Sequence, residues 1–513
     1  MRIILLLFAL IAIGSSCNPI SERKQPIPTL YQLSQMDLKL DGKQLADVYC
    51  GNCHLKPEPE VLDKATWENN VLPDMRRRMG LYLEEDFGVP LPEDLGVPDG
   101  VYAKIPLIKK KDWDKLKEYY LQEAPTELPP NERTTNVKAK VAWLEANEIE
   151  MPRSYSNITT LVLVDKSGLV WLGDSEKGLF QIDLKNKPII LDSISTPLFP
   201  VYLVGNGEGL SLLAMNKIYS NQDSAGVLEH YAEKNSWSKI RLNEGLIRPV
   251  HVSFGHLNMD SIEDYVISHF GNHIGKLSVY LSKNNKLEEM VINSNPGSKK
   301  TVLLDFDSDG DLDVFGIFSK ATGGVYYWEN LGKGEFKERE LLKFHPSFGI
   351  TDFAIKDINQ DGLIDIVLLN GANSNLSPEP KNYQGIRVFL NKGALEFEEE
   401  WFFPLHFGTS LFVEDFDLDG DLDIVVSSSY NSLNQEMHSE IVFFENDQKE
   451  VEFKPYTIQT FKDKNITSLA VGDIDSDGDL DVIAGLFEAP KSSNKLNNYW
   501  TPILLIKNNI LNK

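Results

Sequence analysis

The chain has 513 residues, of which 42% are hydrophobic, and its formal net charge is −25. This apolar content is too high for a disordered chain, and the length exceeds the roughly 100 to 200 residues of one ordinary domain. The acidic balance excludes a nucleic-acid partner, because binding one needs clustered Lys and Arg side chains to neutralise phosphates.

The first residues predict export. An apolar run follows Arg2, and it is too short to span a bilayer but typical of a secretory signal. The small residues before Cys17 (GSSC) resemble the lipobox of bacterial lipoproteins, which implies cleavage before Cys17 and a lipid on its thiol. Gly14 departs from the pattern, since the lipobox usually has Leu there, and an ordinary signal peptide is the alternative.

These features predict a signal peptide over residues 1–16, and a lipidated Cys with a Pro-containing tether over residues 17–40. The protein is then expected at the periplasmic or cell-surface face of a bacterial membrane, held there by its lipid anchor.

Residues 50–54 read Cys-Gly-Asn-Cys-His, the spacing of c-type haem attachment. Two thiols one helical turn apart can bond the vinyl groups of a porphyrin, and the adjacent His54 can then ligate the iron. A redox CxxC and half of a zinc site are the alternatives, but no βαβ pattern surrounds the motif and no other Cys remains for zinc. We predict one covalent haem c held by Cys50, Cys53 and His54.

The flanks of this motif resemble a small cytochrome c over residues 41–131. QLADVY (44–49) and KKDWDKLKEYYLQEAP (110–125) are predicted helices, and the resemblance implies that they cross. Between them, Met75 and Met79 are candidate sixth ligands of the iron. They are four residues apart on one helix face, so only one can reach the iron, and Met75 is preferred because it follows LPD. A Met/His pair favours electron transfer over oxygen chemistry.

A nine-residue acidic pattern recurs between short β-branched apolar runs. Four clear copies are DFDSDGDLD (305–313), DINQDGLID (357–365), DFDLDGDLD (415–423) and DIDSDGDLD (473–481), and a degenerate copy is HLNMDSIED (256–264). Successive copies begin 49, 52, 58 and 58 residues apart, a period typical of solenoids and propellers. Each repeat contains four predicted strands, which is the unit of a propeller blade.

Two earlier segments, 159–183 and 201–214, have the same strand rhythm without the acidic loop. The predicted blades begin near residues 159, 200, 249, 300, 350, 408 and 467, which gives seven blades over residues 155–513, with six or eight blades as the alternatives. The repeats resemble the FG-GAP or VCBS family, which builds the propellers of integrin α chains. Residues 132–154 are predicted as a linker whose segment VKAKVAWLE closes the ring. The predicted fold class is multidomain, an all-α cytochrome c domain followed by an all-β propeller.

The acidic loops predict calcium sites. Oxygen ligands at positions 1, 3, 5 and 9, a main-chain carbonyl at position 7 and Gly at position 6 can surround one hard cation. An EF-hand is excluded because position 12 is not Glu and lies in a predicted strand. We expect about four Ca²⁺ ions that stabilise the blades, and none in the loop 256–264. The predicted ligand positions are Asp305, Asp307, Asp309, Asp311, Asp313, Asp357, Asn359, Asp361, Leu363, Asp365, Asp415, Asp417, Asp419, Asp421, Asp423, Asp473, Asp475, Asp477, Asp479 and Asp481.

The sequence shows no HExxH, nucleophile elbow or phosphate-binding Gly loop. The leading hypothesis is therefore an exported haem c electron-transfer protein whose propeller binds a partner or substrate. It implies a redox partner protein, and a glycan or protein as ligand of the propeller. One alternative is an enzyme, in which the propeller uses a quinone cofactor to oxidise sugars or alcohols within a funnel of basic and acidic groups. The other is a surface adhesion or glycan-binding protein.

Overall fold

The structure is a computed structural model, and it describes residues 28–87, 97, 99–129, 138–139, 141–152, 156–206, 209–217, 224–233, 237–271, 273–283, 286–320, 322–332, 334–371, 379–431, 437–447, 450–488 and 499–512. The predicted signal peptide and Cys17 lie outside the described residues. No helix within the described ranges is long and apolar enough to cross a bilayer.

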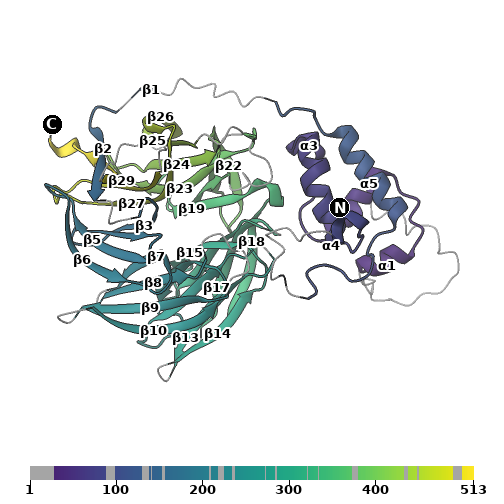
Figure 1. The fold of residues 1–513 in the computed structure, drawn as a ribbon, viewed down its shortest axis with the longest axis horizontal. Helices are drawn as coiled ribbons and strands as arrows, with labels where there is room; N and C mark the ends of the chain where they lie inside the picture. The colour runs from purple at the N-terminus through teal and green to yellow at the C-terminus, as the bar shows by residue number, and fades with distance from the viewer. Residues whose placement is uncertain are drawn as a thin grey trace.

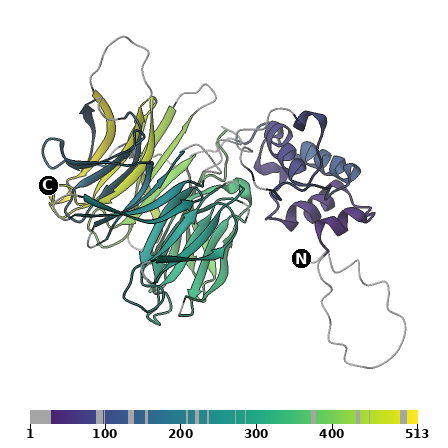
Figure 2. The same cartoon turned by 60° about the horizontal axis from the view of Figure 1, so that its bottom comes forward.

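A small helical unit precedes a seven-bladed β-propeller, and Figures 1 and 2 show it at one side of the propeller. Its α-helices are α1 (Leu30–Gln35), α2 (Gly42–Tyr49), α3 (Lys64–Thr66), α4 (Leu72–Arg78) and α5 (Lys110–Glu123). A π-helical turn spans Trp67–Val71, and short 3-10 turns are Cys50–Asn52, Pro59–Val61, Glu84–Phe87, Pro346–Phe348 and Ile510–Asn512.

The two predicted helices are present as α2 and α5, and they pack together. A Cβ at Gly42 would lie 2.4 Å from the carbonyl oxygen of Lys115, so only glycine allows this close approach. Trp113, Leu116 and Tyr120, the apolar positions of α5, are all buried in the core of the helical unit. The helical period of the sequence therefore identified the buried face of α5 correctly.

Helix α1 corrects the predicted tether, because Leu30–Gln35 is helical rather than extended. Thr29 caps its first turn by accepting a hydrogen bond from the Gln32 N–H at 3.2 Å. Leu30 and Leu33 pack against the core of the helical unit, and this burial of apolar surface stabilises a helix that is short by itself.

Each blade is an antiparallel sheet whose first strand is innermost. Blade 1 contains β3 (Thr159–Val164), β4 (Val170–Asp174), β5 (Gly178–Asp183) and β6 (Ile189–Ser195), and blade 2 contains β7 (Phe199–Asn206), β8 (Gly209–Met215), β9 (Gly226–Glu233) and β10 (Trp237–Leu246). Blade 3 contains β11 (Pro249–Gly255), β12 (Asp264–His269), β13 (Lys276–Lys283) and β14 (Lys286–Asn293), and blade 4 contains β15 (Ser298–Leu304), β16 (Asp313–Phe318), β17 (Gly324–Asn330) and β18 (Phe336–Lys343).

Blade 5 contains β19 (Ile350–Lys356), β20 (Asp365–Asn370), β21 (Gly385–Asn391) and β22 (Phe397–Pro404), and blade 6 contains β23 (Gly408–Glu414), β24 (Asp423–Asn431), β25 (Met437–Asp447) and β26 (Glu450–Phe461). Blade 7 contains β27 (Lys464–Gly472), β28 (Asp481–Glu488), β29 (Tyr499–Asn508) and, from the start of the domain, β2 (Leu144–Pro152). The prediction of seven blades is confirmed, and each inner strand begins within three residues of its predicted start.

The apolar core lies between neighbouring blades. Strand β16 is buried along its whole length, because it is covered on both faces, whereas most of the outer strand β18 is exposed. Phe315 and Ile317 of β16 pack against Ile366 and Leu368 of β20 in the next blade. Continuous apolar runs in the sequence are therefore second strands, and mixed runs are outer strands.

The ring closes between blades 7 and 1. Strand β2 pairs with β29 as the outer strand of blade 7, and the inner strands β27 and β3 are in contact. The closing strand begins at Leu144, near the end of the predicted segment VKAKVAWLE, because Trp143 packs edge-on against Phe443 at 5.3 Å between ring centroids. Strand β1 (Lys138–Ala139) pairs in parallel with β26 and extends blade 6 instead.

The propeller has two different ends. We call one the acidic face, because the acidic loops there join the first strand of a blade to its second. We call the other the helical face, since it carries the connections between blades and the loops between second and third strands. The helical unit contacts this face: Arg78 Nη2 lies 2.9 Å from His273 Nδ1, and the rings of Tyr102 and His273 are 5.9 Å apart.

Candidate functional site

The acidic loops share one backbone conformation. The residue at position 4 has φ between 56° and 65° in all four clear copies, and Gly at position 6 has φ between 87° and 99°. The predicted role of that glycine is confirmed, since few other residues adopt such angles without strain. The turn folds each loop back on itself and gathers its carboxylates.

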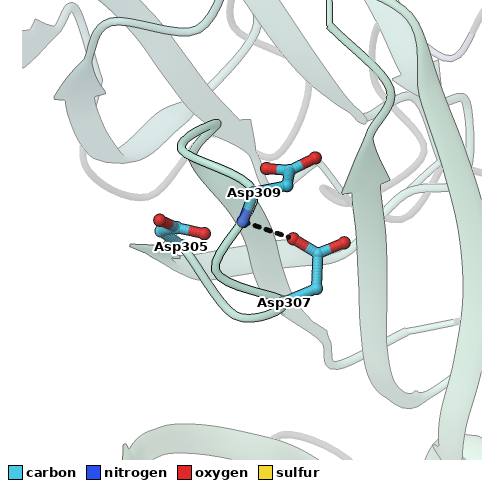
Figure 3. A group of neighbouring side chains, drawn as sticks. All are labelled: Asp305, Asp307 and Asp309. Atoms are coloured by element: carbon cyan, nitrogen blue, oxygen red, sulfur yellow. Dashed lines mark hydrogen bonds between the residues drawn. The ribbon is translucent and has the colours of Figure 1, made fainter.

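Three of the loops bring three carboxylates within 4.8 Å of one another. Figure 3 shows one of them, in which the N–H of Asp309 donates a hydrogen bond to Asp307 Oδ1 at 3.3 Å. The three groups are Asp305, Asp307 and Asp309; Asp415, Asp417 and Asp423; and Asp473, Asp475 and Asp481. Carboxylates this close favour a bound cation, and oxygen ligands suit Ca²⁺.

The loop 357–365 differs from these three, so the prediction of about four calcium sites is reduced to three acidic clusters among the described residues. Asn359 and Leu363 stand where the other loops have Asp. The Asn359 amide donates to Asp361 Oδ2 at 3.1 Å, and Asp357 Oδ2 accepts the Gly362 N–H at 2.9 Å. The Gly362 bond has counterparts in the loops 415–423 and 473–481, so the bond of the Asn359 amide and the apolar Leu363 are what distinguish this loop.

The Asp at position 9 has a second role that the sequence prediction missed. In every copy it is at most 1% exposed, and one oxygen accepts the N–H of position 2 while the other accepts an N–H from the region of the third strand. Asp264 of the degenerate loop does the same, with Leu257 and Ser282 as donors at 2.9 and 2.7 Å. Asp313 does not belong to the carboxylate cluster of its loop. Asp423 and Asp481 belong to theirs and also accept the two backbone N–H groups.

Burial is the main reason why these carboxylates resist ionisation. It raises the pKa of Asp423 to about 8 and that of Asp481 to about 7, and neighbouring carboxylates add to both shifts. A divalent cation among the oxygens would counteract this effect by favouring the charged form.

An Asn lies at or near the end of the third strand in blades 4 to 7, and the sequence prediction did not include it. The Asn330 amide donates to the carbonyl of Leu257 in the preceding blade at 3.0 Å, and the Asn508 amide donates to that of Phe416 at 2.8 Å. These residues connect neighbouring blades on the acidic face. The recurrence of WEN, FLN, FEN and IKN along the chain was the available signal.

The CxxCH segment follows α2 directly, and Cys50–Asn52 forms a 3-10 turn. Both thiols are free, with Cys50 partly buried and Cys53 exposed. Burial raises the pKa of Cys50 to about 11 and also raises that of Cys53, whereas a redox-active CxxC needs a lowered thiol pKa. Within the described ranges, neither thiol belongs to a group of three metal-ligating side chains, which argues against a zinc site.

The ring of His54 is oriented by the backbone. Its Nδ1 lies 3.0 Å from the carbonyl oxygen of Leu55, and an N–H at Nδ1 leaves the lone pair of Nε2 for a metal. Burial lowers the pKa of His54, and the charge of Arg78 at the end of α4 also lowers it, so α4 lies near this ring. Met75 on α4 is partly buried, and Met79 at its C-cap is 8% exposed within the core of the helical unit.

Comparison with known proteins concerns the propeller. Residues 305–368 and 415–484 match the model of the FG-GAP-like repeat, and the matched segments contain the four clear acidic loops. The propeller is an FG-GAP-like repeat propeller. No curated protein matches the chain. A crystal structure of a protein from Lactobacillus plantarum is similar with 10% identity and a TM-score of 0.40, over 59% of this chain and 84% of that chain.

The FG-GAP-like propeller presents a histidine toward the CxxCH segment. Burial is the main reason why the pKa of His345 falls to about 4. A positive charge on His54 also lowers it, so the two rings lie near each other. Its Nδ1 is 2.6 Å from Ser347 Oγ, and its ring stands edge-on to Tyr383 with 5.4 Å between centroids. His345 is therefore neutral near pH 7 and part of an ordered rim on the helical face.

Proposed function

We propose that the protein is a c-type cytochrome joined to a calcium-stabilised FG-GAP-like propeller, in which a haem passes electrons and the propeller binds a partner or substrate. Cys50 and Cys53 would hold the haem through thioether bonds, and His54 would ligate its iron. Met75 or Met79 would be the sixth ligand. When bound, the haem supplies one-electron redox chemistry.

The orientation of His54 is the observation that carries the proposal. The Leu55 carbonyl fixes the Nδ1 side of the ring, which is the support that a metal-ligating histidine needs from a second group. The raised thiol pKa values of Cys50 and Cys53 disfavour a dithiol redox role, and thioether formation remains the chemistry that the spacing suits.

The position of the motif supports a link between the two units. His54 lies near His345 of the propeller, and the charge of Asp63 in the helical unit acts on Lys381 of the propeller. A ligand bound on the helical face would therefore lie on the same side of the propeller as the redox group.

We further propose that the protein is exported and anchored through a lipid on Cys17. The apolar leader and the GSSC sequence support this, and covalent haem attachment to CxxCH takes place outside the cytoplasm. Its redox partner would then be a protein at the same membrane face.

The test is the intact mass of the full-length mature protein, produced in a host that attaches haem c. We expect the added mass of one haem in the wild type, and no added mass after Cys50→Ala together with Cys53→Ala. Met36→Leu, outside the motif, is the control and should carry a full haem. A folded wild type without covalent haem would refute the proposal.

A quinone-dependent dehydrogenase is a second candidate, because basic and acidic groups do line one end of the propeller. Lys300 Nζ and Asp352 Oδ1 pair at 2.6 Å across the inner strands of blades 4 and 5. Reduction of the haem by a sugar or alcohol, dependent on an added quinone cofactor, would establish this activity. Glycan binding with no change in the haem spectrum would instead favour the adhesion hypothesis.

A further inference from the structure

The seven inner strands share one irregularity. In each, the pairing register with the second strand shifts near the start of the inner strand, and one residue is bulged out of the ladder; it is the second residue in five strands, the third in β7 and the fourth in β27. A bulge re-aims its side chain and often lies next to a functional site. The bulged residues are Thr160, Val201, Val250, Lys299, Thr351, Thr409 and Thr467.

Lys299 is the exception among them. Thr351 and Thr409 use the bulge to donate their hydroxyls to carbonyl oxygens of the second strand, at 3.1 and 3.2 Å. The bulge gives these two hydroxyls an acceptor, a role that the ammonium group of Lys299 does not share.

The surroundings of Lys299 are also cationic. Arg248, Lys300 and Lys320 lie close enough for their charges to disfavour its protonated form, and they come from the edge of blade 3 and from blade 4. Arg248 and Lys320 approach the same ring, with the Arg248 guanidinium carbon 5.3 Å and Lys320 Nζ 6.0 Å from the centroid of Phe270. The helical face therefore gathers several positive charges near one point, in a chain whose net charge is −25.

Backbone hydrogen bonds hold these loops together. The Phe270 N–H donates to the Arg248 carbonyl at 3.0 Å, and the Gly297 N–H donates to the Phe270 carbonyl at 2.5 Å. The Ser319 N–H donates to the Gly297 carbonyl at 2.8 Å. The residues that carry the cations are thus anchored in a continuous network, which is the preorganisation that a binding site requires.

One nearby carboxylate, Asp352, is committed elsewhere. Its Oδ1 accepts from Lys300 Nζ at 2.6 Å, and its Oδ2 accepts the N–H of Leu411 at 2.9 Å. Lys299 itself has no hydrogen-bond or ion-pair partner within the part of the chain that the structure describes. The charge of Asp352 favours the protonated form of Lys299, but the oxygens of Asp352 are bonded to Lys300 and Leu411, so Lys299 has no directly bonded counter-ion among the described residues and can receive one from outside the protein.

We propose that Arg248, Lys299 and Lys320 form a binding site on the helical face for a small molecule that carries an oxyanion group. The planar Arg guanidinium suits two oxygens of one carboxylate, phosphate or sulfate, and the ammonium groups act as point charges. His273, three residues after Phe270, contacts Arg78, so the ligand would bind beside the helical unit. The inference rests on the binding part of the proposed function and is independent of the haem.

The test is calorimetric titration of the calcium-loaded, full-length protein with sulfate and with acetate, at an ionic strength held constant with chloride. We expect saturable binding to one site in the wild type. Lys299→Gln and Lys320→Gln should each lower the affinity at least tenfold while leaving the thermal melt cooperative. Lys166→Gln, an exposed lysine on the acidic face, is the matched control and should bind as the wild type does.

Each outcome decides the question. Tighter binding of sulfate indicates a phosphate- or sulfate-bearing ligand, and tighter binding of acetate indicates a carboxylate. The absence of saturable binding, or unchanged affinity in both folded variants, would overturn the proposal. The titration is repeated with Cys50→Ala, because anion binding in a variant with impaired haem attachment separates this inference from the electron-transfer proposal.

Discussion

The two faces of the propeller differ in how they use repetition. On the acidic face, one loop recurs in five blades with a positive φ at position 4 and a buried Asp at position 9. On the helical face, equivalent positions differ from blade to blade, and Lys299 stands where the six other blades have Thr or Val. The repeated residues of the acidic loops stabilise the blades, whereas a residue that differs from its counterparts, such as Lys299, is available for function.

The same physical effect acts on both faces with opposite sign. Burial raises the pKa of Asp423 to about 8, and burial lowers the pKa of Lys299 to about 8. Each face thus concentrates one sign of charge that is poorly solvated, which a counter-ion would stabilise. We expect a cation on the acidic face to act on stability and an anion on the helical face to act on binding.

Removal of calcium should have the largest effect. A site filled at a calcium concentration 100 times its Kd contributes about 3 kcal/mol to the free energy of unfolding, and three acidic clusters are present. A chelator should therefore lower the melting temperature strongly, while sulfate affinity at temperatures below the melt stays the same. A melting temperature independent of calcium would contradict the role assigned to the acidic face.

The next largest effect should come from the Asp at position 9. Asp264→Ala leaves the N–H groups of Leu257 and Ser282 without their acceptor, which costs roughly 1–3 kcal/mol for each. Denaturant unfolding should show this loss with and without calcium. Asp417→Asn is the comparison, because its destabilisation should appear with calcium and vanish with a chelator.

The pH dependence of anion binding should be smaller. The pKa of Lys299 is lowered to about 8, mainly by burial; Asp352 raises it, and Lys320, Arg248 and Lys300 lower it. The amine therefore loses its proton between pH 7 and 9. Sulfate affinity should fall about tenfold over that range if the protonated amine binds. Lys299→Gln should flatten the profile, and an unchanged profile in that variant would assign the dependence to another group.

The same shift has a consequence for stability. Between about pH 8 and the ordinary pKa of lysine, the unfolded chain binds more protons than the folded one, so the free energy of unfolding rises with pH in that window. Below it the buried charge costs stability, and Lys299→Gln should unfold at the same temperature as the wild type or higher at pH 7.

The smallest effect should follow Arg78→Gln, which removes the 2.9 Å contact with His273 and the 2.9 Å ion pair with Asp74. A partly exposed contact of this kind contributes about 1 kcal/mol or less. We expect a shift of a few degrees at most in the melt, and none for the control Lys43→Gln, an exposed lysine of the helical unit with no ion pair among the described residues. A large change in sulfate affinity would show that Arg78 belongs to the anion site.

Most of the fold could be predicted because its signals are local. Each acidic loop marks the end of an inner strand, so the period of the loops located the blades. The start of β2 could not be predicted, since it depends on pairing with β29, more than 350 residues later, and on the burial of Trp143 between blades 6 and 7. Helix α1 was missed because its stability comes from Leu30 and Leu33 packing on a core formed later in the chain.

The sites divide in the same way. The CxxCH spacing is local and was visible at once, whereas the role of Asp313 depends on an N–H of Asn330 in another strand. Arg248, Lys299 and Lys320 come together only when the blades assemble. Lys299 alone stands out in the sequence, because the bulged positions of the six other inner strands carry Thr or Val.

The visible spectrum of haem-matured, full-length protein tests the central claim most directly. We predict the spectrum of a six-coordinate c-type haem in the wild type, loss of the Met–iron band after Met75→Leu, and loss of the six-coordinate spectrum after His54→Ala. Loss of the Met–iron band after Met79→Leu alone would transfer the ligand role to Met79. A wild-type spectrum without bound haem, in protein whose melt is cooperative and calcium-dependent, would contradict the account.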